Sequence, residues 1–317
     1  MKINIFTSDG KAWYTNRVKL YPGVELYENE DSPNIEWDIV VVYENLIREI
    51  QCKAKNYLYI CGEPPYMDYY PQGFLNQFDK VLTANSEIRH PNIICWQQAL
   101  PFHVGRSAIN RNFSLDYNHL LNLKKPYETK LISLIASNLS KLPGHKRRLE
   151  IVRKLEESSF PIDFYGRGRN FVEDKLDAIN PYLFHICIEN TSIPDYWTEK
   201  IADAILCLSV PIYIGCTNIE DYFDSRCMYV AHNYDELVVI LNKVMDAPQE
   251  IYQEKLTYLT EERKKLLDNY NIIEAIKHCK LDNNCLRESR IRPRASFPLY
   301  EFRRKIIVLL LRLGFLH

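Results

Sequence analysis

Apolar and polar positions in the first third of the chain alternate in blocks that are typical of parallel α/β proteins. β-branched and aromatic runs at residues 2–7, 37–44 and 57–61 predict strands, and the stretch around Lys53 predicts a helix between the last two. Residues 78–85 and 93–102 predict two further short strands. Because continuous apolar runs indicate strands buried on both faces, this region predicts a layered α/β domain.

The same alternation begins again after residues 122–130, a polar stretch with one proline that we interpret as a linker. Strands are expected near residues 130–138, 160–168, 183–190, 210–215 and 228–232, and helices at 145–158, 197–208 and 234–245. The predicted boundaries are therefore an α/β domain at 1–125, a second doubly wound α/β domain at 126–280, and a tail at 281–317. Two such domains are expected to face a cleft, where ligands normally bind.

A polar island, IENTSIPDYWTEK, lies between the predicted strand at 183–190 and the helix that follows. Such a position, at the carboxyl end of a strand and the first turn of a helix, is the usual place for a nucleotide in an open α/β sheet. Free N–H groups and partial positive charge at a helix N-terminus suit phosphate. The candidate donor-site residues of the island are Glu189, Asn190, Tyr196, Thr198, Glu199 and Lys200.

Lys200 would add a full positive charge, and as a residue of the first helical turn it is expected to be exposed and to contribute little to stability. Glu199 can accept hydrogen bonds from a ribose diol, although a glutamate that complements the helix dipole explains it equally well. Arg148 follows the turn at Ser137 and Asn138 and is a second candidate cation. A solvated basic helix face, with Lys146 and Arg147 beside it, is the alternative.

The chain has no glycine-rich phosphate loop and no D-x-D pair, so side-chain cations must supply the positive charge for a phosphate, and no metal site is predicted. A net charge of −1 argues against nucleic-acid binding. The nine cysteines are interpreted as free thiols in a reducing compartment. Because the sequence shows neither a signal-peptide pattern nor an apolar run long enough for a membrane span, we expect a cytoplasmic protein.

Positive charge gathers at the end of the chain. Residues 285–317 hold eight Arg or Lys against two Glu and end in the apolar segment IIVLLLRLGFLH. This pattern favours peripheral association with the inner leaflet of the cytoplasmic membrane, with basic groups on anionic headgroups. A helix that docks on its own protein is the alternative.

The polar island and the residues after it resemble the donor motif of family 10 glycosyltransferases, the α-1,3/1,4-fucosyltransferases. DYWTEK at residues 195–200 resembles D-Y-(I/V)-T-E-K, IENT at 188–191 resembles F-E-N-S, and VPIYIG at 210–215 resembles V-P-(I/V)-x-x-G. The resemblance continues in the serine–asparagine turn before Arg148, in FYGRG at 164–168, and in CGEPPY at 61–66, where Glu63 takes the place of the family's glutamate.

This resemblance implies a GT-B fold with the acceptor domain first, GDP-β-L-fucose as donor, and inversion to an α-L-fucoside. It implies that Lys200 and Arg148 neutralise the pyrophosphate, that Glu199 holds sugar hydroxyls, and that Asn190 and Tyr196 line the donor. Glu63 would be the base. The expected acceptor is an oligosaccharide, with O3 of an N-acetylglucosamine in a surface glycan such as lipopolysaccharide O-antigen as the leading choice.

Two alternatives stay open. The same fold could use another GDP-6-deoxyhexose or make another linkage, or the chain could be a non-catalytic module that binds glycan or nucleotide. No cofactor is expected to be required, although Mn²⁺ or Mg²⁺ could stimulate activity. GDP-sugar, oligosaccharide and membrane surface are the expected partners.

Overall fold

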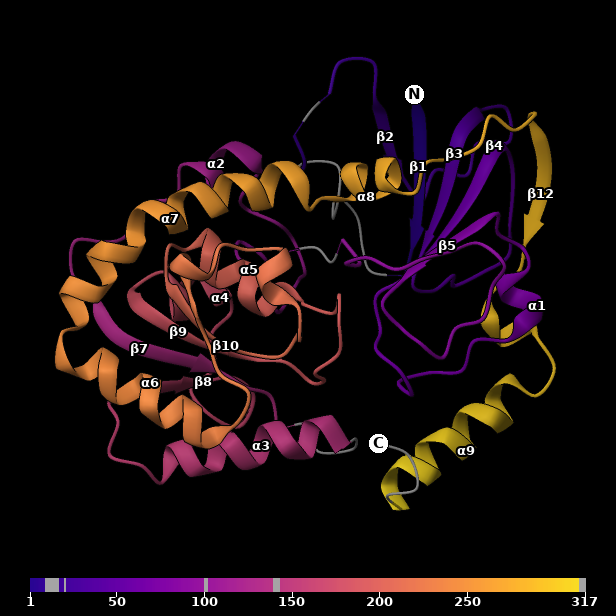
Figure 1. Cartoon of the computed structure of the whole chain (residues 1–317). Coiled ribbons are helices and arrows are strands. Elements are labelled where there is room, and N and C mark those ends of the chain that lie inside the picture. Colours follow the sequence, from indigo (N-terminus) through magenta and orange to yellow (C-terminus); the bar gives the residue numbers. More distant parts are fainter. Residues whose placement is uncertain (9–16, 20, 100–101, 139–142, 314–317) are drawn as a thin grey trace. The chain divides into compact units, whose positions relative to one another are not determined.

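The chain forms two compact units, which we call unit 1 (residues 1–100 and 270–317) and unit 2 (residues 101–269). The computed structural model in Figure 1 describes residues 1–8, 17–19, 21–99, 102–138 and 143–313. This division differs from the boundaries at 125 and 280 that the sequence predicts. The predicted linker belongs to unit 2, where the Lys125 ammonium group donates to the carbonyl of Asn180 at 2.8 Å and to Ser209 Oγ at 2.6 Å.

Unit 1 is built on a seven-stranded sheet with the order β2-β1-β3-β4-β5-β6 and a further strand, β12, beside β4. The strands are β1 (Lys2–Thr7), β2 (Glu25–Glu28), β3 (Glu36–Tyr43), β4 (Ile50–Cys61), β5 (Lys80–Thr83), β6 (Ile93–Ile94) and β12 (Arg287–Ile291). All pairs are parallel except β12 with β4. The buried apolar runs predicted as strands are confirmed.

The predicted helix around Lys53 is wrong, because this residue lies within the long strand β4. Burial along residues 50–55 alternates strictly, with Ile50 buried, Gln51 exposed, Cys52 buried and Lys53 exposed. A period of two places these side chains on opposite faces of a sheet, whereas a helix needs a period of 3.6. The charged residues had masked this alternation.

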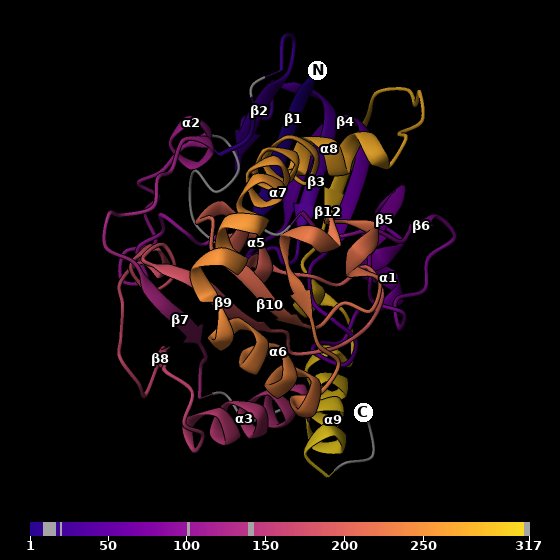
Figure 2. The ribbon, with the colours of Figure 1, turned by 60° about the vertical axis from the view of Figure 1, so that its left-hand side comes forward.

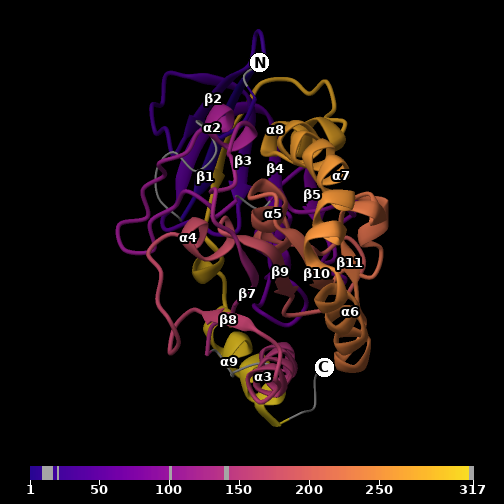
Figure 3. The same ribbon diagram turned by 90° about the vertical axis from the view of Figure 1, so that its left-hand side faces the viewer.

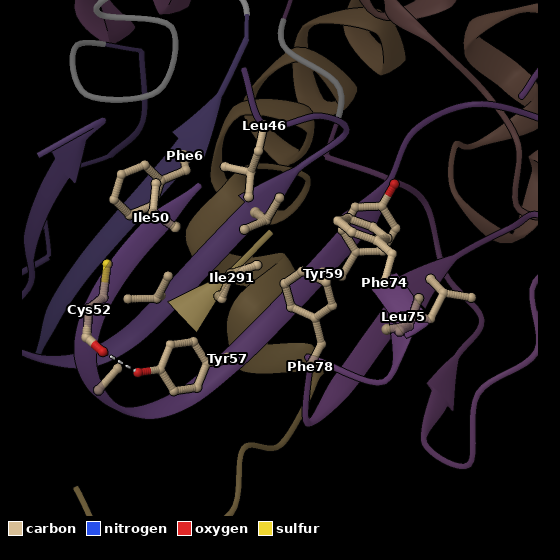
Figure 4. Packing of buried hydrophobic residues seen from close by; sticks show 14 of the residues in the cluster. Phe6, Leu46, Ile50, Cys52, Tyr57, Tyr59, Phe74, Leu75, Phe78 and Ile291 are labelled. Carbon is tan, nitrogen blue, oxygen red and sulfur yellow. Dashed lines mark hydrogen bonds between the residues drawn. The ribbon is translucent and has the colours of Figure 1, made fainter. Parts of the chain in front are cut away.

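One face of the unit 1 sheet carries a cluster of buried aromatic and aliphatic side chains. The ring centroids of Tyr59 and Phe74 lie 5.0 Å apart in an edge-to-face arrangement. Ile291 of β12 points into the same cluster (Figure 4). A residue from the last tenth of the chain therefore completes the core of the first unit.

The C-terminal segment combines a folded part with an exposed part. Beside β12, Arg294 of the short helix η3 (Arg294–Ser296) is only 4% exposed and forms an ion pair with Asp68 at 3.1 Å. The following helix α9 (Tyr300–Leu313) leaves Phe302 62% and Leu309 54% exposed. The first turn of α9 also contacts unit 1, since Arg303 donates to Tyr69 Oη at 2.8 Å and Arg304 Nε lies 3.4 Å from Asp68 Oδ1. These contacts favour the alternative of a docked helix for that turn. The last residues, 314–317, lie outside the described part of the chain.

Unit 2 contains a parallel sheet with the order β11-β10-β9-β7-β8. Its strands are β7 (Lys130–Ile135), β8 (Ile162–Tyr165), β9 (Tyr182–Ile188), β10 (Val210–Ile214) and β11 (Tyr229–Val230). Its helices are α2 (Tyr117–Leu121), α3 (Pro143–Glu156), α4 (Lys175–Ile179), α5 (Glu199–Leu206), α6 (Tyr234–Asp246) and α7 (Pro248–Asn269). The doubly wound pattern predicted for this part of the chain is confirmed.

Helix α5 packs against β9 and β10 on one side and against α7 on the other (Figure 3). After α7 the chain passes within two residues into α8 (Ile272–His278), which belongs to unit 1 (Figure 2). From β7 the chain adds β8 at one edge of the sheet. It then returns to the other side of β7 and adds β9, β10 and β11 in the opposite direction across the sheet. The carboxyl ends of β7 and β9 therefore form a topological switch point, where open α/β sheets bind ligands.

Candidate active site

A cavity of about 300 Å³ lies at this switch point in unit 2. Its wall comes from the ends of β7 and β9 and from the nearby turns of α3, α4 and α5. The lining residues are His103, Ile135, Ser137, Arg148, Lys175, Ile179, His185, Ile186, Cys187, Ile188, Asn190, Glu199, Lys200 and Asp203. Charged groups of both signs thus line one cavity.

The local sequence explains how the polar island turns from β9 into α5. Asp195 adopts a left-handed backbone with φ of 62°, and its carboxylate accepts hydrogen bonds from Asn218 Nδ2 at 3.0 Å and Tyr222 Oη at 2.7 Å. Asparagine and aspartate tolerate this conformation better than most residues because their short side chains bond locally. Thr198 then caps α5, since its side chain accepts from the Lys200 N–H.

Glu189 is buried beneath the cavity and holds Lys200. Its carboxylate, which is 0% exposed, accepts from Lys200 Nζ at 2.9 Å and from the Thr198 N–H at 2.9 Å. Gly215 permits this packing, because a Cβ at that position would lie 2.5 Å from Glu189 Cγ. A buried carboxylate is costly without such partners, so Glu189 supports the cavity wall from below.

Lys200 differs from the exposed helix-start lysine that the sequence predicts, because its side chain is only 20% exposed. Burial opposes its charge, but Glu189 and Glu199 outweigh burial and raise the pKa of Lys200 above its usual value. An ammonium group has three donors, and Glu189 and Thr198 Oγ1 take two of them at 2.9 Å. The ammonium group also lies 3.7 Å from Glu199 Oε1, on the wall of the cavity.

Glu199 belongs to a second charged group on the same wall. Its Oε1 lies 3.1 Å from Lys175 Nζ, which also lies 3.4 Å from the buried Asp203 carboxylate. Burial opposes ionisation, but Lys175 and Lys200 outweigh it and hold the pKa of Glu199 well below its usual value. Burial raises the pKa of Asp203 to about 6 despite Lys175. Glu199 therefore keeps an anionic carboxylate at the cavity.

Arg148 brings a second cation to the cavity from α3. Its guanidinium donates to Asn190 Oδ1, to Ser137 Oγ at 2.9 Å and to the Ser137 carbonyl at 3.2 Å. The first turn of α3 approaches β9 so closely that a Cβ on Gly144 would lie 1.6 Å from the Asn190 carbonyl oxygen. Arg148 is buried, and among the described residues its Nε–H has no hydrogen-bond partner.

The neighbouring basic residues of α3 are placed differently. Arg147 is exposed and donates to Ser192 Oγ at 3.3 Å and to the His232 carbonyl at 3.0 Å. Lys146 is exposed as well, and neither residue lines the cavity. The structure therefore resolves the choice among the three in favour of Arg148 as the cation at the cavity.

The remaining candidates fall into two groups. Five of the predicted donor-site residues line the cavity: Ser137, Arg148, Asn190, Glu199 and Lys200. Four do not line it. Glu189 and Thr198 accept hydrogen bonds from the Lys200 ammonium group, and Tyr196 is buried outside the lining. Asn138 accepts from Arg169 Nη1 at 2.7 Å.

Sequence reasoning missed His103 and Lys175, which line the cavity from segments far from the polar island, and His185, which lies in β9 directly before it. It also missed Asp203, although a signal for it existed. This aspartate follows Glu199 by four residues and lies among the apolar positions of α5, where a charge requires a partner. Its Oδ1 accepts the N–H groups of His103 at 2.8 Å and Val104 at 3.0 Å.

Glu63, the predicted base, lies in unit 1 directly after β4. Its backbone is held on both sides: the N–H donates to Glu44 Oε1 at 2.9 Å, and the carbonyl accepts from Cys61 Sγ at 3.5 Å and from Asn85 Nδ2 at 3.4 Å. Its side chain is partly exposed at the carboxyl end of the unit 1 sheet. Such an edge is where α/β sheets place functional side chains.

The described residues hold no metal cluster, no membrane-spanning helix and no disulfide. No group of three or more His, Cys, Asp or Glu side chains within residues 1–8, 17–19, 21–99, 102–138 and 143–313 is arranged to hold a metal ion. No helix in the same part of the chain has the length and apolar character that crossing a membrane demands. All nine cysteines fall among the described residues, and none forms a disulfide.

A family model described as glycosyltransferase family 10 (fucosyltransferase), C-terminal part, matches residues 126–295. The chain is 29% identical over 120 residues to the Helicobacter pylori alpha-(1,3)-fucosyltransferase FucT. The matched stretch covers 36% of this chain and 24% of the relative. It is 31% identical over 129 residues to the human 4-galactosyl-N-acetylglucosaminide 3-alpha-L-fucosyltransferase 9, covering 38% and 34%. The chain thus spans about a third or less of these relatives' length.

A solved structure described as a crystal structure of alpha1,3-fucosyltransferase superimposes on this chain with a TM-score of 0.52. The sequence identity is 18%, and the match covers 90% of each chain. A similarity of this kind, at 18% sequence identity, establishes the fold alone: two α/β units with parallel sheets.

Proposed function

Since the family model matches more than half of its residues, the chain belongs to glycosyltransferase family 10, and we propose that it transfers L-fucose from GDP-β-L-fucose to an oligosaccharide hydroxyl. The observation that carries the proposal is the pair of buried cations at the unit 2 cavity. Lys200 and Arg148 both line the cavity, and hydrogen bonds to neighbouring groups hold each charged end in place. A diphosphate bound there would bring its negative charge beside these two cations.

The proposed role of the two cations is to stabilise the leaving group. When the bond between the anomeric carbon and the β-phosphate oxygen breaks, its electron pair goes to GDP, and negative charge grows on that oxygen. Fixed cations in a partly dry cavity stabilise such charge strongly and need no reorganisation during the reaction. Glu199, which stays anionic, can accept hydrogen bonds from ribose or fucose hydroxyls.

Glu63 is proposed as the general base of an inverting displacement. The acceptor oxygen forms the new bond to the anomeric carbon from the face opposite the leaving GDP, and its proton passes to the Glu63 carboxylate. The products are then an α-L-fucoside, GDP and one proton. A positioned base of this kind contributes about 10²–10⁴-fold to the rate.

The acceptor is proposed to be an N-acetylglucosamine of a surface glycan such as lipopolysaccharide O-antigen, with fucose added at O3. This choice follows from the two relatives described above, which are named as 3-fucosyltransferases. A different GDP-6-deoxyhexose or linkage remains a second candidate, because the two cations recognise phosphates and not the sugar ring. Linkage analysis of the product decides between them.

The test incubates the protein with GDP-fucose, with and without N-acetylglucosamine-containing acceptors, in EDTA. We expect GDP release and a fucosylated product only when an acceptor is present, at an unchanged rate in the chelator because side-chain cations serve the diphosphate. Binding of GDP-fucose with no turnover on any acceptor would instead identify a binding module. Activity that EDTA abolishes and Mn²⁺ restores would contradict the cation roles.

Peripheral binding to the cytoplasmic membrane is proposed for α9, because its exposed Phe302, Ile306 and Leu309 lie on the same helix as the basic residues 303–305. Co-sedimentation with phosphatidylglycerol vesicles tests it. We expect the double variant Phe302→Ser/Leu309→Ser to lose binding, whereas Val239→Ser, which alters an exposed valine on α6, keeps it. Equal sedimentation of both variants would refute the membrane role.

A further inference from the structure

Two carboxyl groups lie together at the carboxyl end of the unit 1 sheet. Glu44 follows β3 and Glu63 follows β4, and these strands are parallel neighbours in a register that pairs Tyr43 with Ile60. Glu63 is the proposed base, whereas Glu44 belongs to no motif that the sequence analysis identified.

The backbone of Glu44 adopts a conformation that a glutamate rarely takes. Its φ is 59°, in the left-handed region that favours glycine and asparagine. The chain holds this residue in place from β4: the Glu44 N–H donates to the Ile60 carbonyl at 2.9 Å, and the Glu44 carbonyl accepts from Tyr59 Oη at 3.0 Å. Conformations of this kind are unfavourable and persist where the surroundings determine them, often at functional sites.

The strained backbone directs the Glu44 side chain to the peptide groups on both sides of Gly62. Its Oε1 accepts the N–H of Gly62 and, at 2.9 Å, the N–H of Glu63. The Glu63 carbonyl accepts from Cys61 and Asn85. Both main-chain polar groups of the proposed base, its N–H and its carbonyl, therefore have partners. Among these partners, Glu44 alone acts on the N–H of Glu63.

The geometry points to Glu44 as the positioning residue of Glu63: its carboxyl group fixes the main chain from which the base projects, at the cost of a left-handed backbone. This inference rests on the proposed role of Glu63 as the base. It assigns Glu44 no contact with substrate.

The charge of Glu44 fits this role. Burial, with a further contribution from the nearby Glu63, raises the pKa of Glu44 to about 8, against the opposing effect of Arg294. Glu44 is therefore a neutral carboxylic acid near pH 7. The other titratable groups that interact electrostatically with Glu44 are Tyr59, Cys61 and Tyr70.

Three variants of Glu44 separate positioning from bulk structure. Glu44→Gln keeps the neutral shape and an acceptor oxygen for the two N–H groups. Glu44→Gly removes the acceptor and relieves the backbone, since glycine accepts a positive φ without strain. Glu44→Asn also tolerates this conformation, but its side chain is one methylene too short to reach both groups.

We expect Glu44→Gln to keep kcat at pH 7 within about threefold, and Glu44→Gly and Glu44→Asn to lose about tenfold or more, because small misplacements of a reacting group are costly. The KM for GDP-fucose and the Kd for GDP, measured by calorimetry, should change less than about twofold in all three variants, since they report on unit 2. A purely structural role would not be rescued by Gln alone.

A pH series adds an independent measurement. Above about pH 8 the wild-type protein should lose activity as Glu44 ionises beside Glu63, since like charges at close range repel. Glu44→Gln has no such group and should keep its kcat to higher pH. Identical alkaline limbs in the two proteins would overturn the inference.

A parallel Glu63→Gln variant tells the two possible failures apart. If Glu63→Gln loses about 10²-fold or more while Glu44→Gly and Glu44→Asn keep wild-type kcat, the proposed base stands and the positioning role of Glu44 is refuted. If Glu63→Gln itself keeps its rate, the base assignment fails and the inference falls with it.

Discussion

The ion pair between Lys200 and Glu189 joins stability to function at a single residue. Lys200→Met leaves a carboxylate buried without its charge partner, and breaking such a pair costs about 3 kcal/mol of unfolding free energy. In the double variant Glu189→Gln/Lys200→Met the buried charge is gone, so we expect most of that loss to be recovered. Turnover, in contrast, should stay about 10²-fold or more below wild type in both, because the diphosphate has lost a cation.

Urea unfolding and the fucosyl-transfer rate, measured on the same three proteins, check this prediction. Lys146→Met is the matched control, since it removes an exposed charge from α3 close to Arg148 and should change neither quantity. If the double variant recovers turnover together with stability, Lys200 has no role beyond balancing Glu189.

The buried His185 predicts acid sensitivity. It is 3% exposed, its Nδ1 lies 2.7 Å from Ser133 Oγ, and burial, together with Lys175 and Lys125, lowers its pKa to about 3. In the unfolded chain the His185 imidazole is protonated below about pH 6.5, whereas in the folded protein it stays neutral down to about pH 3. The contribution of neutral His185 to the free energy of unfolding is therefore fully present above pH 6.5 and is lost as the pH falls toward 3. At pH 5 the loss is about 2 kcal/mol from this residue.

Thermal unfolding between pH 4.5 and 7 tests whether stability falls as the pH falls. We expect His185→Gln to flatten the dependence of Tm on pH, and His232→Gln, at an exposed position, to leave it as in wild type. A slope that His185→Gln does not change would show that other groups set the acid limit.

At the scale of elements, the C-terminal segment divides into a part that completes the core of unit 1 and a helix that contacts unit 1 through a few polar groups. Removing residues 300–317 deletes α9 alone, and we expect unit 1 to stay folded. Removing residues 287–317 also deletes β12, Ile291 and the buried Arg294, so it opens the edge of β4 and leaves a gap in the core. Circular dichroism melts of the two truncated proteins check this, and equal Tm values would contradict it.

Elements with a single strong pattern could be predicted from the sequence, and elements with mixed signals could not. The run at β3 is buried on both faces and is recognisable as a parallel strand. The first half of β4 alternates with lysines and resembles a polar helix until the pairing with β12 is known. That pairing joins residues more than 200 positions apart, and local periodicity carries no information about it.

The candidate site shows the same limit. The polar island was recognisable because its residues are contiguous and lie between buried segments. Lys175 and His103 reach the same cavity from segments about 25 and 95 residues away from Glu199, and only the fold brings them there. Glu189 and Lys200 were both identified, but their mutual pairing beneath the cavity depends on the register of β9 and α5.

At the scale of the whole molecule, unit 2 is a continuous insertion within unit 1. A segment of residues 102–269 contains the complete sheet and cavity of unit 2. We therefore expect this segment, expressed alone, to fold cooperatively and to bind GDP with an affinity close to that of the full chain, as calorimetry can measure. A segment that stays unfolded would show that unit 2 depends on unit 1 for its stability.

The late position of β12 also bears on how the protein emerges from the ribosome. While residues 1–100 are already outside the exit tunnel, the edge of β4 at residues 50–54 still waits for a partner that is synthesised more than 200 residues later. During that interval an unpaired strand edge is open to other nascent chains. Unit 2 should mature first, and chaperone contact, detectable by crosslinking to arrested chains, should persist until β12 has been translated.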